Sequence, residues 1–236
     1  LALLDASWRE DKKILVLEPR RLAARGAATR MAATLGEAVG GTVGYRVRLG
    51  SKVSARTKIE VITEGIFTRM ILDDPALSSV AAVLFDEFHE RSLDVDLGLA
   101  FALDAQQALR PDLRILAMSA TLDGARVAEL LGQCPVIESE GRAYPIETRY
   151  RSRDPSRRLE DVIVETVRVA LANDQGSVLV FLPGQSEIKR TADLLREQIN
   201  SPSVEIAPLY GAMDPAEQDK AISPAPAGKR KIVLAT

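Results

Sequence analysis

An apolar run that leads directly into charged residues is the feature of this sequence best suited to chemistry. The run Val80–Phe85 is followed by Asp86 and Glu87, and the only histidine of the chain, His89, comes two residues later. A carboxylate in that place can hold a magnesium ion through its water shell, and a second one can orient or deprotonate a water that attacks phosphorus. An imidazole beside them can bond a carboxylate or a hydroxyl from a neighbouring strand end. The stretch therefore points to a metal and nucleotide site.

Two other interpretations of the same stretch stay open. Asp86 and Glu87 can form the acidic first turn of a helix, where the helix dipole stabilises them, and His89 would then lie on the same helical side as Asp86. Alternatively, Asp86, His89 and Asp94 can bind a transition metal directly, although their spacing is not that of a recognised ligand motif. The residue types alone do not choose between these sites.

The elements that must position these residues follow from the hydrophobic pattern. Apolar runs alternate with helix-period segments, which predicts an α/β fold of mostly parallel sheets with helices on both faces. The first half is predicted to hold strands over 13–18, 59–63, 80–85 and 113–119, and helices over 20–35 and 92–109. Gly36 is a natural end for the first of these helices, and Ser92 a natural cap for the second.

A Gly and a Pro close together in the segment 141–145 mark a predicted boundary between two domains, 1–143 and 144–236. Beyond it the pattern predicts strands over 146–150, 177–182, 204–210 and 231–235, and helices near 158–172 and 185–199. The segment 223–231 has the least regular pattern. Because the sequence begins and stops abruptly within predicted elements, we expect the first domain to be incomplete N-terminally and the second C-terminally.

The ends of the predicted strands share a property. Ligands of open parallel sheets bind where loops leave the carboxyl ends of the strands. In the first domain each of these ends carries polar or tight-turn residues, namely Pro19-Arg20-Arg21, Glu64-Gly65, Asp86-Glu87 and Ser119-Ala120-Thr121. The pattern predicts that they face one ligand.

The charge of the chain limits how it can bind nucleic acid. A formal net charge of −2 argues against coating of a polyanion by bulk charge, so a local patch is needed. Basic residues cluster in two places, and each cluster is either a phosphate-binding patch or a solvated charge run: Arg46, Arg48, Lys52, Arg56 and Lys58 in one, and Arg142, Arg149, Arg151, Arg153, Arg157 and Arg158 in the other. Aromatic residues make up only 4% of the chain, which favours backbone contacts over base stacking.

Cysteine usage and hydropathy indicate a compartment. The single cysteine, Cys134, excludes an internal disulfide and a multi-thiolate zinc site, and it fits a reducing environment. No apolar run reaches the roughly 18 residues that a membrane span needs, and the sequence does not begin with a leader pattern. These features predict a cytoplasmic protein without a membrane partner.

Six short motifs resemble those of the DEAH-box branch of the superfamily 2 helicases. "DEFH" (86–89) resembles the family's magnesium and water-activating motif, with Phe88 where the family has Ala, and "SAT" (119–121) resembles the motif that couples hydrolysis to domain movement. Four others resemble nucleic-acid-binding or second-domain motifs: "EPRRLAA" (18–24), "TEG" (63–65), "VLVFLPG" (178–184) and "KIVLAT" (231–236). Together they extend along nearly the whole chain.

The resemblance implies an ATP-dependent RNA helicase core of two RecA-like domains, with ATP and Mg²⁺ between them and single-stranded RNA or another nucleic acid as partner. It assigns Asp86 to water-mediated magnesium binding, Glu87 to the catalytic base, and His89 to a link with the coupling residues Ser119 and Thr121. The implied contacts with nucleic acid are made by Pro19, Arg20, Arg21, Thr63, Gly65, Gly184 and Thr236.

One family motif is absent from the sequence. The phosphate-cradling pattern G-x-x-x-x-G-K-[ST] does not occur, and the only Gly-Lys pair, Gly228-Lys229, is followed by Arg230. We expect this loop to precede Leu1 and the family's arginine-finger motif to follow Thr236. The alternatives are a non-catalytic nucleic-acid-binding or scaffold module of the same fold, and a hydrolase with a metal bound directly to His89.

Overall fold

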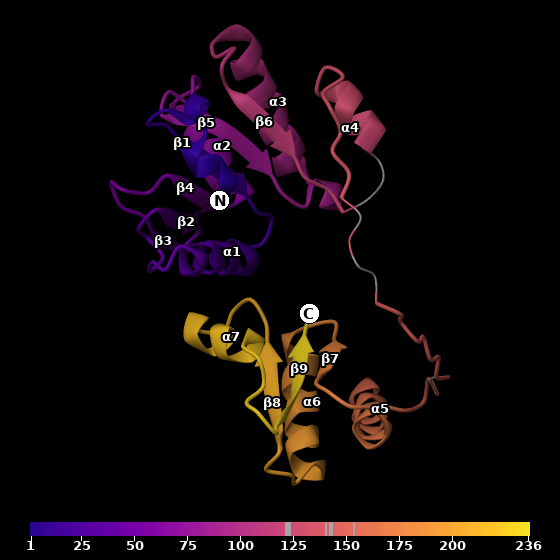
Figure 1. Ribbon diagram of the computed structural model, residues 1–236. Coiled ribbons are helices and arrows are strands. Elements are labelled where there is room, and N and C mark those ends of the chain that lie inside the picture. The colour runs from indigo at the N-terminus through magenta and orange to yellow at the C-terminus, as the bar shows by residue number, and fades with distance from the viewer. Residues whose placement is uncertain (121–123, 140, 142–143, 153) are drawn as a thin grey trace. The chain divides into compact units, whose positions relative to one another are not determined.

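The computed structural model describes residues 1–120, 124–139, 141, 144–152 and 154–236 (Figure 1). These residues form two compact units, Leu1–Gly141 and Arg142–Thr236. Each unit is an α/β structure with its own sheet and its own hydrophobic core.

The first unit is built on a six-stranded sheet with the order β3-β2-β4-β1-β5-β6. Only β3 runs antiparallel to its neighbour, β2. Val, Ile and Leu dominate the central strands, as expected for strands that are buried on both faces. The strands are β1 (Lys13–Leu17), β2 (Val43–Val47), β3 (Gly50–Lys52), β4 (Ile59–Ile62), β5 (Val80–Phe85) and β6 (Arg114–Ala117).

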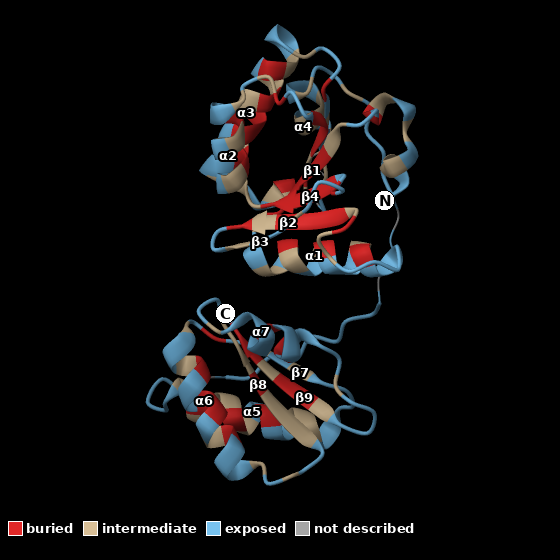
Figure 2. Cartoon of the chain, turned by 90° about the vertical axis from the view of Figure 1, so that its left-hand side faces the viewer, coloured by how far each residue is buried: buried red, intermediate tan, exposed pale blue. Residues whose placement is uncertain are grey.

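Helices cover both faces of this sheet (Figure 2). The helix α1 (Arg21–Thr34) packs Ala24, Ala28 and Ala32 against one face, and these small side chains allow a close approach to the strands. The helices α2 (Glu64–Asp73) and α3 (Leu93–Ala108) cover the opposite face. Because side chains alternate along a strand, β1 supplies residues to both cores. Shorter elements are the 3₁₀ turns η1 (Ala2–Asp5), η2 (Ser7–Arg9) and η3 (Phe88–Glu90), and α4 (Gly124–Leu130).

The ends of α1 and α3 confirm two sequence predictions. Gly36 follows α1 with φ 71°, and its N–H donates to the carbonyl of Ala33, while the N–H of Glu37 donates to that of Ala32. This is the pattern that favours glycine after a helix. At the start of α3 the Ser92 hydroxyl accepts the N–H of Val95 at 3.0 Å, so Ser92 is the cap.

The second unit has a parallel sheet with the order β7-β9-β8, formed by β7 (Val178–Phe181), β9 (Arg230–Ala235) and β8 (Val204–Leu209). The helices α5 (Leu159–Asn173) and α6 (Gln185–Gln198) enclose the core on one face. On the other face, α7 (Pro215–Ile222) is fastened by the buried Lys231, whose Nζ donates to the carbonyls of Lys220 and Ser223. Helices therefore lie on both faces here too.

The predicted fold class is confirmed, but the strand predicted over 146–150 is wrong. This stretch belongs to no strand, and Ile146 and Tyr150 are 89% and 93% exposed. The charged residues between them form side-chain pairs instead, because Arg149 contacts both Glu147 and Asp174. Strand propensity is easily overridden by such tertiary context.

Two strands and three helices were not predicted: β2, β3, α2, α4 and α7. Gly44 and Arg46 interrupt the apolar pattern of β2, and this part of the sequence stood out for its basic residues instead. A usable signal existed for α7, since Asp214 precedes Pro215 and accepts the N–H of Ala216 at 2.8 Å. Among the helices that the structure describes, none is long and apolar enough to cross a membrane.

Candidate functional site

The loops after β1, β5 and β6 are joined by backbone hydrogen bonds at the carboxyl edge of the first sheet. The N–H of Asp86 donates to Leu17 of β1 at 3.0 Å, and the N–H of Phe88 donates to Met118, beyond β6, at 2.9 Å. Glu18, directly after β1, donates to Ile62 at the end of β4. The structure thus brings the polar ends of four strands to one edge, as the topology of a parallel sheet requires.

Asp86 and Glu87 do not begin a helix, which corrects the helix-start interpretation. Glu87 has φ 50°, in the left-handed region, and its N–H donates to Asp86 Oδ1 at 2.8 Å. Only the single turn η3 follows, and α3 begins at Leu93. The positive φ turns the chain at Glu87, so that the two neighbouring carboxylates sit in a tight turn above the sheet.

His89 connects Glu87 with the loop after β6. Its Nε2 lies 3.4 Å from Glu87 Oε2, and its Nδ1 accepts the N–H of Ala120 at 3.3 Å. The sequence suggested that His89 and Asp86 lie on the same side of a helix, but the chain turns at Glu87 and no helix spans the two residues. Ala120 is flanked by the predicted coupling residues: Ser119 lies at this edge, and Thr121 lies outside the described residues.

Phe88, which stands where the family has Ala, anchors the turn in the core. The side chain is 2% exposed and packs edge-on against Phe85, with ring centroids 6.5 Å apart. Phe85 packs in turn against Phe67 of α2 at 5.8 Å. The guanidinium of Arg91 lies 5.4 Å above the Phe88 ring. The buried aromatic ring thus anchors the turn that carries Glu87 and His89.

Glu18 is a buried acid at this edge whose role the sequence did not reveal. The residue is 7% exposed, and burial, together with the nearby carboxylate of Asp86, raises its pKa to about 7. Burial disfavours the charged form of a carboxyl group, and a neighbouring negative charge adds to the effect. An acid that ends an otherwise apolar strand was the available signal.

Two predicted nucleic-acid-binding segments contact the stretch that carries Asp86 and Glu87. Arg20 Nη2 lies 2.8 Å from Glu90 Oε1. The Ser92 hydroxyl donates to Glu64 Oε2 at 2.8 Å, next to Thr63, which precedes α2. Of the remaining candidates in the first unit, Pro19 is half-buried, and Arg21 and Gly65 are exposed.

The two candidates of the second unit share the carboxyl edge of its sheet. The N–H of Leu182 donates to Ala235 at 2.7 Å, which joins the loops after β7 and β9. Gly184 precedes α6, and Thr236 is exposed directly after β9. Nearby in sequence, the Gly-Lys pair is part of a turn with Gly228 at φ 75°, and Arg230 donates to Leu171 and Gly176 at the end of α5.

The two basic clusters differ in how far their charges are already paired. In the first, Arg46 reaches Glu60, which is fully buried and also pairs with Lys13. In the second, the described arginines that precede α5 all pair with acids: Arg149 with Asp174, Arg151 and Arg157 with Glu165, and Arg158 with Asp161. Arg142 and Arg153 lie outside the described residues.

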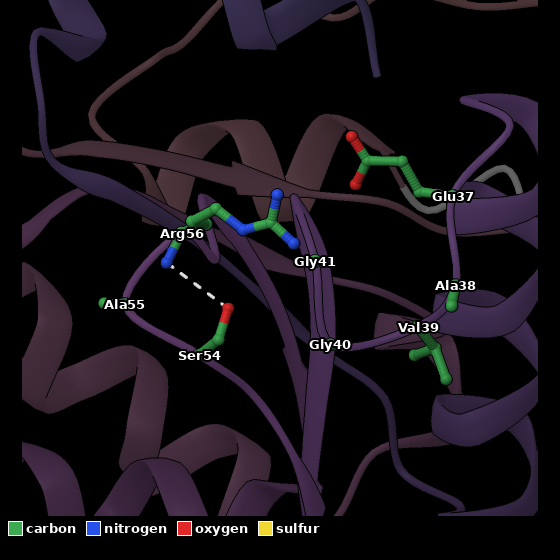
Figure 3. A pocket seen from close by; sticks show the side chains of 8 residues that line it. All are labelled: Glu37, Ala38, Val39, Gly40, Gly41, Ser54, Ala55 and Arg56. Carbon is green, nitrogen blue, oxygen red and sulfur yellow. Dashed lines mark hydrogen bonds between the residues drawn. The ribbon is translucent and has the colours of Figure 1, made fainter.

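Within the described residues, neither a direct metal site nor the hollow lined by residues 37–41 and 54–56 coincides with these side chains. Over the described ranges, no group of three or more His, Cys, Asp or Glu is arranged to hold a metal, so Asp86, His89 and Asp94 do not form one. A hollow of about 530 Å³ lies between the loop after α1 and the loop before β4 (Figure 3). Glu37 and Arg56 face it from opposite sides, but Glu37 is occupied by the N–H and hydroxyl of Thr42.

The chain is similar in sequence to known helicases over nearly its whole length. A family model described as the helicase conserved C-terminal domain matches residues 158–236. The ATP-dependent RNA helicase HrpB of Escherichia coli is 51% identical over 224 residues, which cover 95% of this chain and 28% of that protein. The pre-mRNA-splicing factor ATP-dependent RNA helicase prp22 of Schizosaccharomyces pombe is 35% identical, over 99% of this chain and 20% of that protein.

A solved structure gives the same result for the fold. The crystal structure of the Escherichia coli DEAH/RHA helicase HrpB matches with a TM-score of 0.88 at 51% identity, over 96% of this chain and 29% of that one. The chain thus spans less than a third of the length of these relatives. The resemblance inferred from the short motifs is confirmed: over nearly its whole length the chain is similar, in sequence and in fold, to one segment of the DEAH/RHA helicase HrpB.

Proposed function

We propose that this segment is the motor core of an ATP-dependent RNA helicase, in which ATP hydrolysis drives movement along or separation of nucleic-acid strands. The observation that carries the proposal is the meeting of Asp86, Glu87 and His89 with Glu18 and Arg20 at one sheet edge. Relatives named ATP-dependent RNA helicases support it.

The roles follow from where each group lies. Glu87 is partly exposed and is the base that takes a proton from the attacking water. His89 links Glu87 to the loop that begins at Ser119, through the N–H of Ala120. We assign backbone contacts with nucleic acid to Pro19, Arg20, Arg21, Thr63 and Gly65 in the first unit. In the second unit we assign them to Gly184 and Thr236.

Asp86 is the residue that would hold Mg²⁺ through water. The donors around it are carboxylate oxygens, which are the hard ligands that this ion prefers. One oxygen of Asp86 is engaged by the N–H of Glu87, and Glu18 lies beside it. A bound Mg²⁺ would neutralise charge on the phosphates. The excess of carboxylates here favours the binding of a cation. Separately, we assign the protein to the cytoplasm, and its single cysteine fits a reducing compartment.

The test is nucleic-acid-stimulated ATP hydrolysis by the full-length protein. We expect stimulation by single-stranded RNA at fixed salt, loss of turnover in Glu87→Gln, and nucleotide binding that survives this substitution. The same assay with single-stranded DNA of matched length shows which of the two polymers stimulates ATP hydrolysis more. Binding of RNA without any ATP turnover in the wild type would instead support a scaffold module.

A further inference from the structure

Glu90 lies between the proposed catalytic residues Glu87 and His89 and the proposed nucleic-acid-binding residue Arg20. Its carboxylate pairs with Arg20 at 2.8 Å, and both side chains are solvent-accessible, 34% and 72% exposed respectively. Arg20 is one of the residues to which we assign phosphate contacts. Carboxylates and phosphates engage the same donor edge of a guanidinium, so a phosphate bound by Arg20 competes directly with Glu90.

The backbone ties Glu90 to the catalytic turn. The N–H of Glu90 donates to the carbonyl of Glu87 at 2.8 Å and closes η3. This short turn is flanked by two residues with positive φ, Glu87 at 50° and Arg91 at 43°. Such a conformation persists only when its surroundings hold it. A side chain that anchors this turn from outside is therefore well placed to influence Glu87 and His89.

A second contact fixes the far end of the same stretch. Ser92 donates to Glu64 Oε2 at 2.8 Å, beside Thr63. Side-chain contacts from residues 86–92 thus reach both nucleic-acid segments of the first unit. Of these two contacts, only Arg20–Glu90 involves a cation that would bind a phosphate of the nucleic acid. It is therefore the contact that nucleic-acid binding must change.

We propose that Glu90 is a positioning residue that holds Arg20 in the absence of nucleic acid and releases it to a phosphate, so that occupancy of Arg20 is transmitted to the turn of Glu87 and His89. The inference rests on the proposed function. An exposed ion pair is worth a factor of about 1.4 to 5 in an equilibrium. A contact of that strength biases Arg20 without preventing its release.

The experiment measures affinity for a fluorescein-labelled single-stranded oligouridylate by anisotropy, with the full-length protein at fixed salt and without nucleotide. Glu90→Gln keeps the shape of the side chain and removes its charge, so we expect binding about two- to fivefold tighter. Arg20→Gln weakens binding. In the double variant Arg20→Gln, Glu90→Gln, the gain from Glu90→Gln disappears, because no guanidinium remains to be released.

Asp94→Asn is the matched control, because Asp94 is an exposed acid nearby, at the start of α3. A second readout is the RNA concentration that gives half-maximal ATPase stimulation, which falls in Glu90→Gln by the same factor as the dissociation constant. A residue with a purely structural role would not tighten binding.

The outcomes separate this inference from the proposed function. Equal tightening by Glu90→Gln with and without Arg20, or equal tightening by Asp94→Asn, would show a general charge effect and overturn the inference. RNA binding unchanged by Glu90→Gln would overturn it too, while leaving the helicase proposal intact. Failure of every form to bind RNA would instead overturn the proposed function, and this inference with it.

Discussion

The carboxyl edges of the two sheets differ in charge. In the first unit, Glu18, Asp86, Glu87 and Glu90 gather at the edge. In the second, the residues that follow β7 and β9 directly, Leu182 to Gly184 and Thr236, carry no charge. A mostly parallel sheet and a parallel sheet therefore present very different carboxyl edges to a ligand.

The difference matches the two roles that we propose for the two edges. Burial and, after it, the nearby carboxylate of Asp86 raise the pKa of Glu18, and a bound cation or a proton relieves the repulsion between the two carboxylates. Such a cluster suits metal-assisted phosphoryl chemistry, whereas an uncharged edge can offer backbone groups and a helix start to a polyanion. Substitutions at the two edges should therefore have contrasting effects.

The largest contrast is expected from Glu87→Gln. Loss of a general base lowers turnover by a factor of about 10² to 10⁴, while the neutral amide still allows nucleotide to bind. The measurement is steady-state ATP hydrolysis by the full-length protein, with nucleotide affinity measured separately. Glu197→Gln, an exposed acid near the end of α6, is the control and should leave turnover unchanged. Wild-type turnover in Glu87→Gln would refute the base assignment.

Phe88→Ala tests whether the turn depends on its aromatic anchor. The ring is 2% exposed, and removal of such a ring from a core costs about 3 to 5 kcal/mol of unfolding free energy. Phe181→Ala in β7 makes the same chemical change where the ring is 71% exposed, so it should cost less than about 1 kcal/mol. Urea unfolding measures both. Equal costs would mean that the Phe88 ring does not anchor the turn.

Glu18→Gln should stabilise the protein at alkaline pH. The folded state holds a proton on Glu18 up to a pKa of about 7, whereas the group ordinarily ionises near 4.5. Stability from this group is therefore complete below about pH 4.5 and is lost as the pH rises through 7. Glutamine avoids that loss, so the variant should gain roughly 1 to 3 kcal/mol at pH 8 and little at pH 4.

Another buried acid of the same sheet provides the control for Glu18. Glu60 is fully buried but pairs with Lys13 and Arg46. Glu60→Gln removes the charge that pairs with both cations and should destabilise the protein, because the fully buried side chain then loses its charge-assisted contacts. Urea unfolding in chelator-containing buffer compares the two variants. Destabilisation by Glu18→Gln at pH 8 would contradict the expected repulsion.

These contrasts also show what could be read from the sequence. Long apolar strands that end in polar residues predicted β1, β4, β5 and β6, but not β2 or β3, and predicted that Asp86, Glu87 and Arg20 lie at one edge of the sheet. Side-chain geometry could not be predicted, because a left-handed turn at Glu87 redirects His89 and depends on Phe88 packing in the core. The strand predicted over 146–150 failed for a similar reason, since Arg149 pairs with the distant Asp174 as well as with its neighbour Glu147.

The smallest effect is expected from Ser92→Ala, which removes two hydrogen bonds at the charged edge. Ser92 caps α3 and donates to Glu64, and loss of a serine cap costs about 1 kcal/mol. Asp214→Ala removes the corresponding cap of α7 in the second unit, where the aspartate accepts the N–H of Ala216. If the Ser92–Glu64 contact adds to the cap, Ser92→Ala lowers the free energy of unfolding by more than Asp214→Ala does in urea unfolding. Ser92→Asp then recovers the cap but not the contact, because its carboxylate is repelled by that of Glu64. Full recovery in Ser92→Asp would show that the Ser92–Glu64 contact adds nothing to the free energy of unfolding. It would leave the Arg20–Glu90 pair as the side-chain tie between the turn at Glu87 and the segments that we propose to bind nucleic acid.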